Sequence, residues 1–312
     1  MSSLGSLRQI RWRIRSVENT KKITRAMEMV AAAKLRRFQD FLESAKPYTE
    51  RLEDLVERLL EESPVGYEHP FLQGERVGGR GKESTLLVLF TSDTGLCGTY
   101  NGDLEEKARE WLHQHREKEI SFVFVGKHGA SLFHRKETED LGTFFDLRVS
   151  RVDEILLGLR KRLESIFLEG KVDEVHVAYT HLESLARYHP RIERILPIFP
   201  SPLPRRQAGS PLPLKGDRVK GEGGGIPFLI EPDAKTVLDK LLPAFFEARL
   251  RFIFYHALLT EQIARMSAMR QATQNAGEMI DELTLLRNKA RQAAITKEII
   301  EVVSGSRALK LK

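Results

Sequence analysis

Two long helical patterns, one at each end of the chain, restrict the fold more than any other feature of the sequence. Residues 4–61 repeat apolar or small side chains every three or four positions, interrupted by Pro47, where we expect a kink. The second pattern runs from Pro243, which we expect at the first helical position, to about Leu309. At about 1.5 Å per residue, this second pattern gives a rod of about 100 Å. A helix of that length needs a partner, so we expect the two terminal helices to pair as a long antiparallel coiled coil.

The middle of the chain has a different hydrophobic period. Short apolar or alternating runs suited to strands are separated by helical stretches. The predicted strands are 85–92, 121–126, 173–180 and 228–233, and the predicted helices are 101–119 and 152–169. Because strands alternate with helices, we predict a Rossmann-like α/β domain with a largely parallel sheet.

The composition places the boundaries between these parts. Residues 63–82 (SPVGYEHPFLQGERVGGRGK) and 201–225 are rich in Pro and Gly, and we expect a linker at the first and a mobile loop at the second. The predicted parts are an N-terminal coiled-coil helix at 1–62, a linker at 63–84, an α/β domain at 85–232 and a C-terminal coiled-coil helix at 233–312.

Positive charge is concentrated near the N-terminus. The net charge of the chain is +6, but residues 1–39 contain ten Lys or Arg and only the two acids Glu18 and Glu28, which gives 10 − 2 = +8 for that segment. A helix this basic favours an acidic partner, which can be nucleic acid, an anionic membrane or an acidic protein surface.

The sequence contains neither an apolar run long enough to cross a bilayer nor an apolar signal core at its N-terminus. The helical pattern continues through the N-terminal residues, and we interpret them as part of the mature fold. The single cysteine, Cys97, excludes an intramolecular disulfide, in keeping with a reducing compartment.

Two short stretches resemble catalytic or cofactor motifs. TSDTGLCG (91–98) contains the Asp-Thr-Gly triplet of aspartic proteases, which require a second aspartate facing the first. The chain has no second Asp-Thr-Gly or Asp-Ser-Gly, so we interpret Asp93 as a turn residue. GKHGA (126–130) lacks the phosphate-loop and dinucleotide patterns, and we expect a structural turn. We expect Cys97 to be a small buried residue, and we assign no catalytic residue, cofactor or metal ligand to this chain.

Small residues accumulate on both terminal helices. ITRAMEMVAAAKL (23–35) has little polar surface, and a stripe on the second helix thins from bulky residues to alanine at Ile280, Leu283, Leu286, Ala290, Ala293 and Ala294. Such residues let two helix backbones approach closely. The pattern is open to two interpretations, an ordinary tight coiled coil or a slim shaft that fits inside another structure.

Three blocks of the sequence resemble the gamma subunit of F-type ATP synthases, the central rotor stalk. They are IRSVENTKKITRAMEMVAAAKLRRFQ (14–39), SDTGLCGTYN (92–101) and ARMSAMRQATQNAGEMIDELTLLRNKARQAAITKEIIEVVSGSRAL (264–309). Their order and spacing agree with the family over essentially the whole chain. The chain departs from the family at Thr94, where Arg or Lys is usual, and at Arg287, where Tyr is usual. By this resemblance, Asp93 is a structural turn residue.

The resemblance implies a non-catalytic rotor subunit that turns inside a hexameric ring of alpha and beta subunits, with its foot on the epsilon subunit and the membrane c-ring. It implies a peripheral location at the cytoplasmic face of the bacterial inner membrane, with membrane contact only through the complex and no nucleic acid. The implied stator-ring contacts are Lys22, Arg25, Met27, Lys34, Arg291, Gln292, Thr296 and Glu298. The alternative is a basic coiled-coil protein that binds nucleic acid, which the charge permits but which leaves residues 264–309 unexplained.

Overall fold

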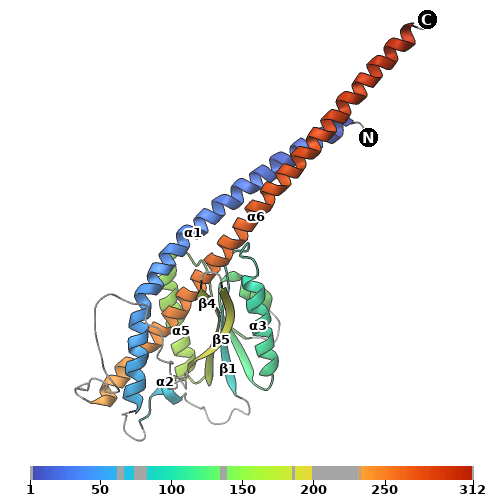
Figure 1. Ribbon diagram of the computed structural model, residues 1–312. Coiled ribbons are helices and arrows are strands. Elements are labelled where there is room, and N and C mark those ends of the chain that lie inside the picture. The colour runs from blue at the N-terminus through green and yellow to red at the C-terminus, as the bar shows by residue number, and fades with distance from the viewer. Residues whose placement is uncertain are drawn as a thin grey trace, which may run out of the picture.

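Two long helices run alongside an α/β domain at one end of the molecule and extend away from it as a slender shaft (Figure 1). The computed structural model describes residues 3–61, 67–73, 83–133, 139–184, 187–198, 231 and 233–310. The shaft helices are α1 (Ser3–Glu61) and α6 (Ala234–Lys310). They come from opposite ends of the chain and lie antiparallel, as predicted. None of the described helices combines the length and apolar character needed to cross a bilayer.

The sheet of the α/β domain has the strand order β3-β2-β1-β4-β5. Its strands are β1 (Ser84–Phe90), β2 (Glu119–Val125), β3 (Glu139–Phe144), β4 (Glu174–Ser184) and β5 (Arg187–Leu196). The strands from β1 to β4 pair in parallel, whereas β5 pairs antiparallel with β4. The prediction of a largely parallel sheet is therefore confirmed.

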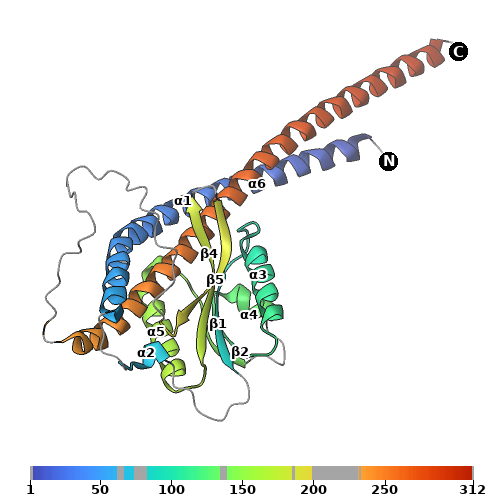
Figure 2. The ribbon, with the colours of Figure 1, turned by 60° about the horizontal axis from the view of Figure 1, so that its bottom comes forward.

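Helices cover both faces of this sheet, as the continuously buried strand β1 requires. Alternate residues of β1 point to opposite faces. Leu86 and Val88 belong to a core shared with α1, α6 and α5 (Val152–Leu168), whereas Leu87 and Leu89 pack with α3 (Tyr100–Gln114) and α4 (Lys127–Phe133). Figure 2 shows α5 on one side of the sheet, and α3 and α4 on the other.

The coiled-coil seam predicted for the N-terminal helix is confirmed. The buried residues that follow the predicted spacing of three or four positions are Ile10, Ile14, Leu35, Phe38, Leu52, Val56 and Leu59. Pro47 lies inside α1, which is one bent helix in Figure 2. Because the lower seam residues belong to the main core, α1 joins the shaft to the α/β domain.

The expectation that Pro243 occupies the first position of the C-terminal helix was wrong. The helix begins at Ala234, and Pro243 lies inside it. Asp233 caps the first turn, since its carboxylate accepts hydrogen bonds at 2.8 Å from both the backbone N–H and the hydroxyl of Thr236. Leu238 and Leu242 are fully buried, and this burial offsets the cost of a proline in the helix.

Several short elements were not predicted. β3 contains a glycine, and β5 is an edge strand that contains Pro190 and several charged residues, so neither has a clear strand pattern. The predicted linker contains the short helix α2 (Pro70–Gln73). Most of the predicted strand at 228–233 and the whole predicted loop at 201–225 lie outside the described residues.

The two motif-like stretches have structural roles. The Asp93 carboxylate accepts backbone hydrogen bonds from Lys127 at 3.2 Å and from Leu147 at 2.6 Å, so it ties together the loops that follow β1, β2 and β3. Gly126 is a turn residue with a φ of +94°, as expected, but the residues after it form α4 rather than a turn. Cys97 is buried, as predicted.

Candidate functional site on the helical shaft

Beyond the α/β domain, the molecule is reduced to α1 and α6, which pack closely because small side chains line their seam. Ala31, Ala276 and Ala294 are buried there. Thr24 and Thr273 meet across the seam with their hydroxyl oxygens 2.8 Å apart. Short side chains on both helices keep the shaft narrow.

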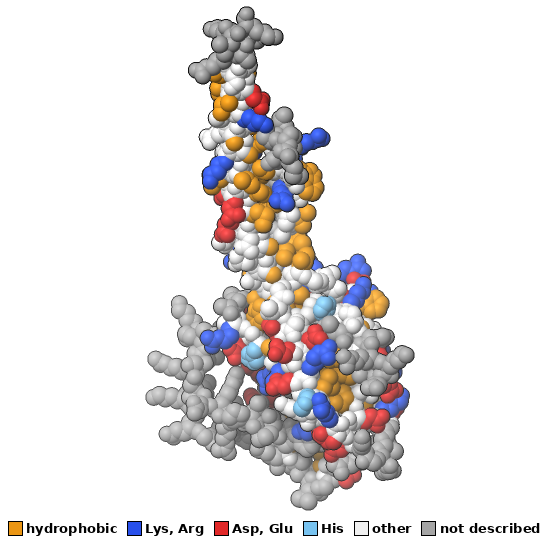
Figure 3. Space-filling model, turned by 90° about the vertical axis from the view of Figure 1, so that its right-hand side faces the viewer, with side chains coloured by type: hydrophobic (Ala, Val, Ile, Leu, Met, Phe, Trp, Pro, Cys, Tyr) orange, Lys and Arg blue, Asp and Glu red, His pale blue; other side chains and the backbone are white. Residues whose placement is uncertain are grey.

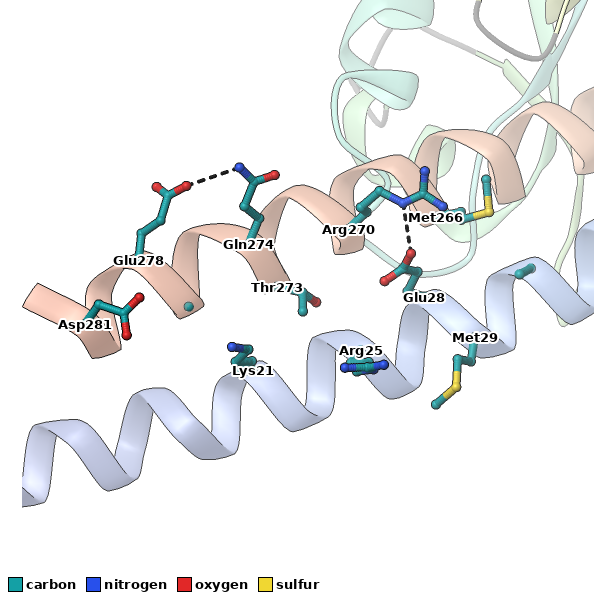
Figure 4. Close-up of a pocket in the computed structure, with 12 residues that line it drawn as sticks. Lys21, Arg25, Glu28, Met29, Met266, Arg270, Thr273, Gln274, Glu278 and Asp281 are labelled. Carbon is teal, nitrogen blue, oxygen red and sulfur yellow. Dashed lines mark hydrogen bonds and ion pairs between the residues drawn. The ribbon is translucent and has the colours of Figure 1, made fainter.

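A groove of about 630 Å³ opens between the two helices in the middle of the shaft (Figure 4). On α1 it is lined by Lys21, Arg25, Glu28, Met29 and Ala32, and on α6 by Met266, Arg270, Thr273, Gln274, Gly277, Glu278 and Asp281. The groove therefore offers three cations, three carboxylates and two methionines along about four turns of helix.

Side-chain interactions partly organise this groove. Arg270 Nε donates to the Glu28 carboxylate at 3.0 Å, which joins α6 to α1. Gln274 donates to Glu278 at 3.1 Å along α6. A methyl group added at Gly277 would lie 3.1 Å from Lys21 Nζ, so the glycine leaves the space that the lysine occupies. The groove can hold Lys21 beside Arg25 because α6 has no side chain at this point.

The far end of α6 continues past the N-terminal end of α1 as a single helix (Figure 1). Its large apolar side chains are exposed, up to 72% for Val302. We call Ile295, Ile299, Ile300, Val302 and Val303 the apolar tip. Figure 3 shows that hydrophobic side chains are also spread along the shaft below it. An apolar surface of this kind marks a contact region.

Comparisons with known proteins identify the family. A family model described as ATP synthase matches residues 6–309. The ATP synthase gamma chain of Moorella thermoacetica is 38% identical over 308 residues, which cover 98% of this chain and 100% of that protein. The chain belongs to the ATP synthase gamma family. The gamma chain of Methylibium petroleiphilum is 37% identical, with 97% of this chain and 98% of that protein covered.

A solved structure has the same fold at lower sequence identity. A chain of the Euglena gracilis mitochondrial ATP synthase matches with a TM-score of 0.63 and 16% identity, covering 98% of this chain and 95% of that chain. The coiled-coil shaft and the α/β domain are therefore features that this gamma-family chain shares with that structure. The comparisons give no support to the nucleic-acid alternative.

The stator contacts predicted on α1 of this gamma-family chain lie in the middle and lower parts of the shaft. Lys22 and Arg25 are exposed, and Arg25 lines the groove. Met27 and Lys34 are partly buried. Lys34 lies near the buried Glu261 of α6, at the neck where the shaft leaves the α/β domain.

The contacts predicted on α6 lie near its free end. Arg291, Gln292, Thr296 and Glu298 are all exposed. Arg25 follows Thr24 on α1, and Thr24 contacts Thr273 of α6. From Thr273 to Arg291, α6 rises about 27 Å. The structure therefore divides the predicted residues into two separate regions of the gamma shaft and does not bring them into one site.

Sequence reasoning missed two parts of the candidate site in this gamma-family chain. Lys21 joins Arg25 in the groove, and their spacing of four residues on a helix is a signal that could have paired them. The apolar tip was also missed, although Ile299-Ile300 and Val302-Val303 are apolar residues beyond the partner helix. Predicting the groove would have required knowing that α1 packs against α6 at Gly277, and the sequence alone does not show this.

Proposed function

We propose that the chain is the central-stalk rotor of an ATP synthase and couples ion-driven rotation of a c-ring to the nucleotide cycle of catalytic beta subunits. The observation that carries this proposal is the apolar tip on a single exposed helix. Burying one Ile or Val side chain contributes about 1.5–3 kcal/mol. The tip therefore favours a partner that surrounds it, and a ring of alpha and beta subunits around the end of the shaft supplies one.

The groove supports a second contact, lower on the shaft. Lys21 and Arg25 of α1 line it beside the Arg270–Glu28 pair, which faces solvent on its arginine side. Cations on a narrow helix pair favour acidic loops, and such contacts set the orientation of a partner as well as its association rate. The two contacts lie about 27 Å apart along the shaft. Forces that the ring applies at these two positions can therefore turn the shaft. Lys22, Arg25, Met27 and Lys34 belong to the lower contact, and Arg291, Gln292, Thr296 and Glu298 to the upper one.

The α/β domain then forms the foot of the rotor. We place the epsilon subunit and the c-ring at this end, and the whole subunit at the cytoplasmic face of the bacterial inner membrane. The curated relatives are bacterial gamma chains, and the Euglena structure is described as containing F1 and the c-ring. The membrane contact of the chain is made through the complex.

A rotation experiment tests this function. Gln114 is exposed at the end of α3, on the side of the α/β domain away from α5. The one native cysteine, Cys97, is buried, so a bead carrying a thiol-reactive linker reacts selectively in a Gln114→Cys variant. The variant is assembled with alpha and beta subunits, and the ring is fixed to a surface through its beta subunits.

The proposal predicts stepwise rotation of the bead in one direction when ATP is added, and none when ATP is replaced by ADP. Complexes that hydrolyse ATP while the bead stays still would contradict the rotor role. Nuclease treatment before purification distinguishes the rotor from the nucleic-acid-binding alternative. A chain that is held in the complex only by nucleic acid would be lost from the purified complex.

A further inference from the structure

The strand order creates one point at the carboxyl edge of the sheet where the connections diverge. β2 and β3 lie on one side of β1, and β4 lies on the other. In open α/β sheets, ligands bind in the crevice outside the strand ends at such a point. In this chain, α6 reaches that position. Thr260 Oγ1 of α6 lies 3.2 Å from the carbonyl oxygen of Thr180 in β4, and the Tyr100 hydroxyl donates to the Ala257 carbonyl at 3.2 Å.

Arg265 fastens this part of α6 to the loop that follows β1. Its guanidinium donates to the carbonyl oxygen of Thr94 at 2.9 Å, to the Thr94 hydroxyl at 3.1 Å and to the carbonyl oxygen of Gly95 at 3.4 Å. A rigid fork of donors that reaches several acceptors fixes direction as well as distance. Arg265 therefore holds one helix of the shaft in a defined orientation relative to the sheet.

Glu261, one turn earlier on α6, completes this arrangement. Its carboxylate accepts from Arg265 Nη1 at 2.6 Å, and the two side chains are only 8% and 9% exposed. Burial raises the pKa of Glu261, whereas the positive charges of Arg265 and of Lys34 on α1 oppose that rise. Charges this deeply buried are retained only with close partners. Arg265 and Glu261 thus belong together, and α1 faces the same pair.

We propose that Arg265 and Glu261 form a torsional lock that fixes the angle of the shaft relative to the α/β domain and so makes the rotor stiff. The proposal rests on the rotor function proposed above. α6 occupies the crevice that a ligand takes in related sheets, and Arg265 makes the hydrogen bonds to the loop after β1. Arg265 is a positioning residue, because it acts through the orientation of the shaft and not at a nucleotide site.

The position of Arg265 along α6 supports this role. Below it, α6 packs on the sheet mainly through apolar side chains such as Phe254, whose ring contacts Phe90 with centroids 5.5 Å apart. Apolar burial has no direction, and the neutral hydrogen bonds described above and the partly exposed ion pairs to α5 hold an angle less firmly than the buried, charged fork of Arg265 does. Above it, Arg270 and Thr273 bond to α1 instead of the domain. Arg265 therefore lies where the shaft leaves the α/β domain. A hydrogen-bonded contact at this point resists rotation of the shaft relative to the domain.

The rotation assay described above tests the lock in the fully assembled complex. The bead on the α/β domain reports the angular spread during each pause between steps. Hydrogen bonds to charged groups are roughly twice as strong as neutral ones, so Arg265→Gln is expected to about double the variance of the bead angle. The ATP hydrolysis rate is expected to stay within about twofold of the wild type, because the nucleotide sites are not touched. Arg109→Gln, which breaks an exposed pair with Glu105 on α3, is the matched control and is expected to leave the variance unchanged.

A reversible crosslink gives an independent measurement. A Cβ built at Gly98 lies 3.7 Å from the Cβ of Ala268, close to the mean separation of about 3.8 Å in disulfides. Gly98→Cys with Ala268→Cys, in a Cys97→Ala and Arg265→Gln background, joins the same loop to α6 one turn beyond Arg265. Oxidation is expected to return the variance to the wild-type value, and reduction to raise it again. Comparing the two redox forms of one protein cancels the strain of a non-glycine residue at position 98, where φ is +60°.

The outcomes separate this proposal from the rotor function. Rotating Arg265→Gln complexes with unchanged variance would overturn the lock and leave the rotor function intact. A wild-type complex that never rotates would contradict the rotor function, and the lock with it. If Arg265→Gln does not assemble, Arg265→Lys is measured instead, since it keeps the charge beside Glu261. Failure of both to assemble would assign Arg265 to folding and overturn the proposal.

Discussion

Thr24 and Thr273 lie 249 residues apart in the chain, yet their hydroxyl oxygens are 2.8 Å apart across the shaft. Thr24 donates to the Lys21 carbonyl within α1 and accepts from Thr273. Like the small apolar residues along the seam, the two threonines let the helices pack closely. Their hydrogen bond also fixes the register of α1 against α6.

Thr273→Val is expected to lower the free energy of unfolding by about 1 kcal/mol, because it removes one partner of this hydrogen bond. The double variant Thr24→Val, Thr273→Val is expected to lose less than the sum of the single variants, since no polar group is then left without its partner. Urea denaturation followed by circular dichroism measures the three values. Strict additivity would show that the two hydroxyl groups do not interact.

The sequence was informative where contacts repeat locally and poor where they join distant segments. The seam of α1 could be predicted because Ile10 and Ile14, and again Leu35 and Phe38, recur at helical spacing. β5 could not, because an edge strand tolerates charges and a proline that mask its pattern. The groove depends on Lys21 meeting a glycine from the other end of the chain, and no local signal encodes that meeting.

His256 is expected to make the stability of the fold pH-dependent. Burial first, and then the nearby His181 and Lys46, lower the pKa of His256 from 6.5 to about 4. Its ring stacks on that of His181 with centroids 4.9 Å apart, and the ring of His189 in β5 lies 5.7 Å from that of His181. A histidine whose pKa is lower in the folded state than in the unfolded chain favours folding at pH values above its unfolded pKa. This contribution is lost as the pH falls from about 6.5 towards 4.

The loss attributable to His256 amounts to about 2 kcal/mol at pH 5. Denaturant unfolding at pH 7 and at pH 5 measures it. His256→Phe keeps a ring against His181 but does not titrate, so its stability should fall less between the two pH values. An equal fall in both proteins would assign the acid sensitivity to other groups, such as His181, whose pKa is also lowered by burial.

The exposed pair Arg291 and Gln292 is expected to matter to the complex and not to this chain alone. The double variant Arg291→Ala, Gln292→Ala should unfold at the wild-type temperature, because both side chains are in solvent and alanine favours helix. A hydrogen bond to a charged group contributes about 1.5–3 kcal/mol, so losing it at the rate-limiting rotor angle should slow ATP turnover roughly tenfold. Lys289→Ala, at an exposed position outside the predicted set, is the control. Wild-type turnover in the assembled double variant would refute the contact.

Asp93 is expected to be structural despite its protease-like neighbours. Asp93→Asn should lower the free energy of unfolding by about 1.5 kcal/mol, because an amide replaces a carboxylate that accepts two backbone hydrogen bonds. Asp153→Asn, at an exposed carboxylate paired with Arg251, should change it by about 0.5 kcal/mol or less. Neither the wild type nor Asp93→Asn is expected to cleave peptides. Peptidase turnover that disappears in Asp93→Asn would reverse this assignment.

Gly277 offers a way to separate the strength of the shaft from the role of its groove. Gly277→Ala should raise the stability of α6 by up to about 1 kcal/mol, because alanine is the better helix former. The added methyl would lie 3.1 Å from Lys21 Nζ, and this flexible side chain must then shift within the groove. Gly102→Ala, in α3 of the α/β domain, meets no atom within 4 Å, so it tests the gain from alanine in a helix with the shaft unchanged. If an acidic loop of the ring enters the groove, Gly277→Ala should bind the ring of alpha and beta subunits more weakly while melting at a higher temperature, and Gly102→Ala should bind as the wild type does. Unaltered binding by Gly277→Ala would exclude the groove from the rotor–ring contact and leave the apolar tip as the remaining candidate.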